Sequence, residues 1–218
     1  MKQFRAFALF VVAIPAAQAK WITVWTGSVQ GPYPVGNASA QPVLTPVFPV
    51  PETGARDQTF RLIVRPDLWG AQARLRFSNA LGTRPVTFDG VYAGLQSSGA
   101  ALVAGTNRPV LFGGKPSVTI AAGAEEWSDP VALNFRGLPA PSLAGRKLAV
   151  SFHIAGESGP MTWHAKALTT SYLNAPGKSA KGNDETELSF PFSTTSCVFP
   201  RRRRYDRPGR CQARGRLW

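Results

Sequence analysis

The sequence predicts an all-β protein, an antiparallel β-sandwich of jelly-roll type. Apolar and polar residues alternate with a period of two in several short runs, which places every second side chain on one face of a strand. Turn residues, among them 21 glycines and 19 prolines, separate these runs. No window has the period of an amphipathic helix. Eight or more short strands on one chain favour a sandwich.

The first element, residues 1–19, is predicted to be an export signal. Lys2 and Arg5 form a positive start, residues 6–14 are an apolar run, and Ala17-Gln18-Ala19 matches a small-residue cleavage site. The apolar run is too short to span a bilayer as a helix. We therefore expect an exported protein, periplasmic or extracellular, with no transmembrane span after cleavage.

The body, residues 20–196, is predicted to be the β-sandwich. Near its start, residues 31–51 are predicted to be irregular or extended, because six prolines fall within them. Strands follow, and those at 59–65 and 73–78 are expected to be half-buried. The order of strands in the sheets is left open. The predicted strands are residues 59–65, 73–78, 85–88, 101–104, 117–120, 130–133 and 147–154.

The last element, residues 197–218, differs from the body. Its sequence, CVFPRRRRYDRPGRCQARGRLW, holds eight of the 25 basic residues, both cysteines and one acidic residue. We expect this basic tail to be irregular and disordered. The body has 15 basic and 11 acidic residues, so the net charge of +13 comes largely from the chain ends. Nucleic acid is therefore not the expected partner.

The body carries no complete catalytic motif. The nearest match to a nucleophile elbow, G-x-S-x-G, is residues 156–160, where Pro160 replaces the final glycine, so we read a polar turn. The imidazoles available as general bases are His153 and His164. His153 falls on the outward face of its strand and is expected to be solvated. No cysteine accompanies these histidines in the body, so we predict no metal site and no cofactor.

A ligand site is predicted from aromatic residues near both ends of the body. Trp25 and Tyr33 lie close together after the signal segment, and Trp163 and His164 are adjacent on a later predicted strand. Secreted β-sandwiches can bind sugars through exposed aromatic faces. The alternative is that these side chains pack within or against the sandwich.

Five segments then resemble a known family. They are WTGSVQGPYPVG (25–36), RLRFSNALGTRPV (74–86), GTNRPVLFGGKPSVTIAAGAEEWSDPV (105–131), LAVSFHI (148–154) and GPMTWHAKALTTSY (159–172). Together they resemble the N-terminal region of secreted bacterial SGNH/GDSL-type esterases. The resemblance implies an accessory jelly roll that is normally linked covalently to an α/β hydrolase domain. From the aromatic residues we expect a carbohydrate or an acylated polysaccharide as a partner.

The family's catalytic motifs are absent from this sequence. There is no Gly-Asp-Ser and no Asp-x-x-His, so no catalytic residue is carried over and the chain is predicted to be inactive alone. The family pattern is lost at Cys197, which suggests that residues 197–218 come from a shifted reading frame and that a hydrolase domain is missing. Two alternatives remain open, a freestanding carbohydrate-binding module and a protein that binds polyanions through its arginine-rich tail.

Overall fold

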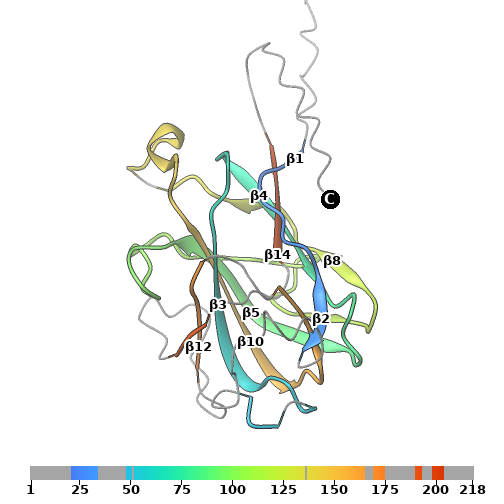
Figure 1. The fold of residues 1–218 in the computed structure, drawn as a ribbon. Coiled ribbons are helices and arrows are strands. Elements are labelled where there is room, and N and C mark those ends of the chain that lie inside the picture. The colour runs from blue at the N-terminus through green and yellow to red at the C-terminus, as the bar shows by residue number, and fades with distance from the viewer. Residues whose placement is uncertain are drawn as a thin grey trace, which may run out of the picture.

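The computed structural model describes residues 21–33, 48–50, 52–135, 137–164, 169–174, 190–192 and 198–203. These residues build antiparallel sheets, so the predicted antiparallel β-sandwich is confirmed, and its jelly-roll type stays a prediction (Figure 1). The elements are β1 (Ile22–Thr23), β2 (Gln30–Tyr33), β3 (Arg56–Val64), β4 (Gln72–Ser78), β5 (Val86–Leu95), β6 (Arg108–Pro109), β7 (Val118–Ile120), β8 (Glu125–Trp127), β9 (Val131–Ala132), the 3-10 helix η2 (Ala140–Leu143), β10 (Leu148–Glu157), β11 (Met161–Trp163), β12 (Ser171–Leu173), β13 (Phe190–Phe192) and β14 (Val198–Arg203).

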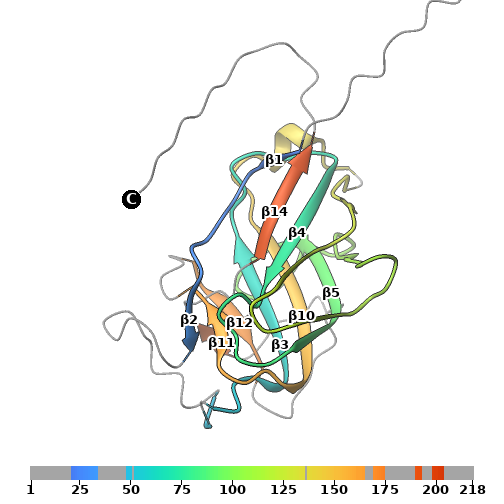
Figure 2. The ribbon, with the colours of Figure 1, turned by 90° about the vertical axis from the view of Figure 1, so that its right-hand side faces the viewer.

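Two large sheets form the layers of the sandwich. One has the order β1-β14-β4-β8, with β9 also paired to β4. The other has the order β13-β12-β3-β10-β5-β6, with β7 also paired to β5. A small third sheet pairs β2 with β11. Figure 2 shows β14 and β4 side by side in front of β3 and β10.

Strand β4 is half-buried, as its alternation predicts. Ala73, Leu75 and Phe77 are buried, whereas Arg74 and Arg76 on the opposite face remain partly exposed. A strand that covers the core with one face and meets water with the other needs this period of two.

Strand β3 was expected to be half-buried too, and this prediction is wrong. Residues 58–64 are buried on both faces. Arg61, on the face away from the core, is fully buried and donates from Nε to Ser151 Oγ (2.8 Å) and from Nη1 to the carbonyl of Ala100 (2.5 Å). That face is covered because a second apolar cluster packs there, formed by Ile63, Leu102 and Ala149 with Tyr172.

The core between the layers is rich in phenylalanine. Phe77 on β4 meets Phe152 on β10 edge-on, with ring centroids 5.8 Å apart. Phe152 also stacks on Phe60 (5.3 Å) and meets Phe88 edge-on (5.1 Å). The Phe77–Phe152 contact joins the two large sheets, whereas Phe60 and Phe88 lie on strands β3 and β5, which flank β10 in the same sheet.

Most of the other predicted strands fall on observed ones. The predictions at 85–88, 117–120, 130–133 and 147–154 overlap β5, β7, β9 and β10. The prediction at 101–104 is wrong, because the segment makes only an isolated bridge from Leu102 to Gln96. Its alternation reflects the burial of Leu102 against the outer face of the β3 sheet.

Part of the expected tail is a strand. Val198–Arg203 form β14, which pairs with β4 on one side and with β1 on the other, so these six residues differ from the irregular tail that was predicted. The signal segment, both cysteines and the remaining tail residues lie outside the described residues. The predicted boundaries after residues 19 and 196 stay predictions.

Candidate functional site

The small β2–β11 sheet brings together the segments that hold the four predicted ligand residues. Met161 pairs with Tyr33, and Trp163 pairs with Gln30. Trp25 precedes β2, and His164 directly follows β11. The side chain of Tyr33 lies outside the described residues, so the site is built from the other three.

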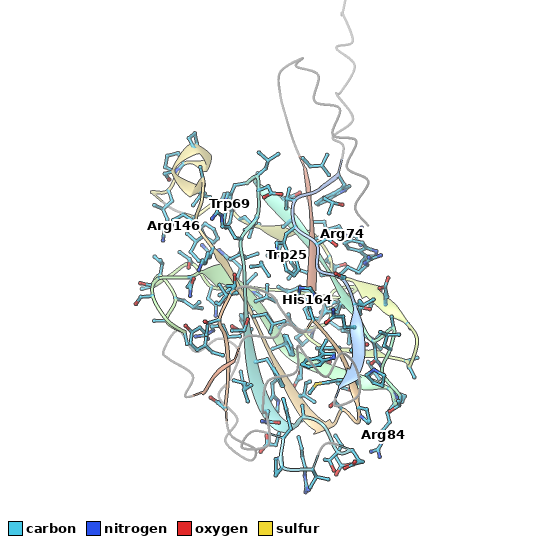
Figure 3. All side chains as sticks on the ribbon, in the orientation of Figure 1. Trp25, Trp69, Arg74, Arg84, Arg146 and His164 are labelled. Atoms are coloured by element: carbon cyan, nitrogen blue, oxygen red, sulfur yellow. The ribbon has the colours of Figure 1, made fainter. Side chains whose placement is uncertain are left out.

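Trp25 and His164 border the same glycine. A Cβ added to Gly27 would lie 3.3 Å from Cη2 of Trp25 and 3.7 Å from Cγ of His164. The indole and the imidazole therefore approach one another across a position that has no side chain. Trp25 is half-buried and packs against the core. Figure 3 labels both side chains, which lie near one another.

The backbone fixes the imidazole of His164. Its Nδ1 lies 2.8 Å from the carbonyl oxygen of Ser28. A carbonyl only accepts, so Nδ1 carries the hydrogen and donates. When the ring is neutral, Nε2 keeps a lone pair and can accept a hydrogen bond from a ligand hydroxyl. The half-buried pair of Trp25 and His164 thus offers an apolar ring beside one acceptor, which suits a sugar.

Trp163 belongs to the core. Its side chain is 3% exposed and lies in the main apolar cluster. In this arrangement its indole offers no face to a ligand. The sequence left open whether these residues bind a ligand or pack within the sandwich. Trp163 packs within it, while Trp25 and His164 remain candidates for binding.

The histidine and serine side chains that could support hydrolysis, His153 and Ser158, each bond to other groups. His153 lies on the face of β10 away from the core, as predicted, but the expectation that it is solvated is wrong. Its side chain is only 19% exposed, and Nε2 lies 3.0 Å from Oδ1 of Asp57. Ser158 is buried, accepts from the Ala55 N–H (2.8 Å) and donates to the Gly159 carbonyl (2.8 Å). Ser158 therefore ties the segment between β10 and β11 to residues 53–55, and the predicted polar turn is instead a buried, bridged segment.

A second polar surface was missed from sequence. On the outer face of the β4 sheet, the guanidinium carbons of Arg74 and Arg76 lie 5.7 Å and 5.3 Å from the centre of the Trp127 ring. Arg76 also pairs with Glu125 at 3.0 Å. The alternating arginines at 74 and 76 signal an outward face, but the pairing of β4 with β8 that supplies Trp127 is not visible in the sequence.

Comparison with protein-family models and with curated proteins found no match. Among the described residues, no helix is long and apolar enough to cross a membrane. The functional argument therefore depends on the Trp25–His164 site and on the resemblance of the five sequence segments.

Proposed function

We propose that this chain is the exported, non-catalytic β-sandwich domain of an SGNH/GDSL-type ester hydrolase, and that it holds an acylated polysaccharide for that enzyme. The observation that carries the proposal is the Trp25–His164 pair, in which a half-buried indole and an oriented imidazole border Gly27. Such a surface contacts the apolar face of a sugar ring and accepts one hydroxyl hydrogen bond.

The hydrogen bonds at the possible catalytic groups support a non-catalytic role. Acyl transfer needs a hydroxyl within reach of a base that is itself oriented. His153 has such an orienting partner in Asp57, but among the described residues no serine hydroxyl bonds to it or to His164. Ser151 on the same strand is fully buried and accepts a hydrogen bond from Arg61.

An esterase assay tests the non-catalytic part. We expect the purified full-length chain to hydrolyse p-nitrophenyl acetate no faster than His153→Gln and His164→Gln variants. Ser158→Ala would not serve as a control here, because Ser158 is buried and accepts a hydrogen bond from the Ala55 N–H, so its loss would disturb the fold. Turnover that falls tenfold or more in either variant would show a catalytic imidazole and overturn the proposal.

A binding assay tests the polysaccharide part. We expect the chain to be retained by insoluble acetylated xylan, and Trp25→Ala to weaken retention about tenfold, equivalent to ~1.4 kcal/mol. The matched control is Trp127→Ala, which removes a partly exposed tryptophan from the other surface and should bind as the wild type does. Equal loss in both variants, or none in Trp25→Ala, contradicts the proposed site. Equal retention on deacetylated xylan would favour a freestanding carbohydrate-binding module.

A further inference from the structure

Arg74, on the outward face of β4, is held by a carbonyl group that is itself fixed. Its Nε donates to the carbonyl oxygen of Ser128 at 2.7 Å. Ser128 is fully buried, its N–H donates to the Leu75 carbonyl (2.8 Å), and its Oγ accepts from the Leu75 N–H (2.9 Å). Ser128 is thus tied to the backbone of β4 itself, so the acceptor of Arg74 has a fixed position.

The indole of Trp127 supports the same guanidinium. The guanidinium carbon of Arg74 lies 5.7 Å from the centre of the Trp127 ring, and that of Arg76 lies 5.3 Å from it, both within cation–π range. Trp127 takes this position because β8 pairs with β4 and sets it opposite Arg76. A guanidinium that is already stacked and hydrogen-bonded loses less conformational entropy when it binds an anion.

The charges of the two arginines are balanced differently. Arg76 pairs with Glu125, from Nη1 to Oε2 at 3.0 Å. Arg74 is also only partly exposed, yet among the described residues it has no ion pair, and its side chain makes only the hydrogen bond from Nε to Ser128. Its two terminal NH₂ groups therefore have donors left to give. The outward face of β4 thus presents one oriented cation whose charge no described carboxylate balances.

We propose that Arg74 and Trp127 form a subsite for a single sugar carboxylate, the uronate group of an acidic polysaccharide. Two NH₂ groups side by side match the two oxygens of a carboxylate in a bidentate pair. The half-buried indole of Trp127 supplies apolar surface next to that pair for the sugar ring. The carboxylate of Glu125 on the same face repels a second anion, so the site suits one charge and not a dense polyanion such as nucleic acid.

This subsite is independent of the Trp25–His164 site and of the proposed function. A neutral acetylated xylan carries no carboxylate for Arg74, so the subsite leaves retention on that polymer unchanged. The basic residues of the chain also attract any polyanion without a specific site. The test therefore uses a short ligand, the trisaccharide of galacturonic acid, in NaCl at about 0.15 M, where the screening length is about 8 Å.

The first arm compares two arginines that carry the same charge. Isothermal titration calorimetry on the full-length chain should show that Arg74→Gln weakens trigalacturonate binding at least tenfold. Arg65→Gln, which removes an exposed arginine just after β3, should change the dissociation constant less than twofold. Arg74→Lys should weaken binding at least fivefold, because lysine keeps the charge but has no planar fork. Equal losses at positions 65 and 74, or wild-type binding by the lysine variant, overturn the subsite.

The second arm changes the ligand and keeps the wild-type chain. The neutral trisaccharide of galactose should bind at least tenfold more weakly than trigalacturonate, because it has no carboxylate for Arg74. The peptide Glu-Glu-Glu carries carboxylates without sugar rings and should bind at least fivefold more weakly. Equal affinity for the neutral trisaccharide overturns the recognition of a carboxylate, and equal affinity for the peptide overturns the assignment to a sugar.

The third arm follows the Arg74 side chain itself by NMR. Its Nε–H resonance is assigned through its correlations to the rest of the Arg74 side chain in the wild type. We expect trigalacturonate to shift this resonance in a saturable way, with the dissociation constant found by calorimetry. This arm reads the wild-type surface directly, so it holds whether or not the variants lose stability. A resonance that stays in place at saturating ligand overturns the proposal.

Discussion

Truncation of Phe152 tests whether the two large sheets share one aromatic core. The side chain is 1% exposed and contacts three other rings, Phe60, Phe88 and Phe77, at centroid distances of 5.3, 5.1 and 5.8 Å. Replacing a buried phenylalanine with alanine costs about 3–5 kcal/mol. Because each ring pair adds roughly 0.5–1.5 kcal/mol beyond the buried area, we expect the upper part of that range.

The measurement is urea unfolding followed by tryptophan fluorescence. We expect Phe152→Ala to lower the free energy of unfolding by ~4 kcal/mol and the thermal midpoint by about 12 °C, at ~3 °C per kcal/mol for a chain of this size. Thr87→Ala is the matched control on the neighbouring strand β5. It removes only an exposed hydroxyl contact to Thr119 (2.8 Å) and should cost about 0.5 kcal/mol or less.

A double-mutant cycle then isolates the contact between the sheets. Phe77 is on β4 and Phe152 is on β10, so their coupling reports directly on how the layers pack. We expect a coupling free energy of about 0.5–1.5 kcal/mol between Phe77→Leu and Phe152→Leu. A cost below ~1 kcal/mol for Phe152→Ala, or additive effects in the cycle, would refute the proposed aromatic core.

Three further substitutions probe local features. Ser158→Ala leaves a buried backbone N–H without its acceptor and should cost about 1–3 kcal/mol in urea unfolding. Gly54→Ala should cost more than Ser158→Ala in the same assay, because Gly54 has φ +66° and its new Cβ would overlap the Gly159 carbonyl; an equally stable variant would contradict this close approach. Arg76→Ala removes a partly exposed ion pair and a contact with Trp127, so we expect a loss of about 1 kcal/mol or less that shrinks in high salt.

The alternation of apolar and polar residues correctly predicted a strand that buries only one of its faces. Leu75 and Phe77 alternate with Arg74 and Arg76, and β4 is found with those faces inward and outward. Alternation failed to describe β3, because the cover of its second face is not encoded in β3 itself. The hydrogen bond from Arg61 to Ala100 and the packing of Leu102 come from a distant loop.

The sequence could predict which residues belong to the candidate site, but it could not predict how they lie relative to one another. Trp25 and His164 stand out as an aromatic residue and an imidazole in a chain with two histidines. Their approach depends on the long-range pairing of β2 with β11 and on the missing side chain at Gly27. Sequence spacing cannot reveal either feature. Nor could it separate Trp163, which points into the core from the same strand pair.

Strand β14 forms although its own sequence does not predict a strand. Val198–Arg203 has no alternation that would predict a strand, and Pro200 argues against one. The segment is extended because the edge of β4 presents unpaired N–H and C=O groups that any extended backbone can satisfy. The strand at residues 198–203 therefore depends on the edge of β4 and not on the pattern of those six residues themselves. A property of the partner strand is not visible in the local sequence.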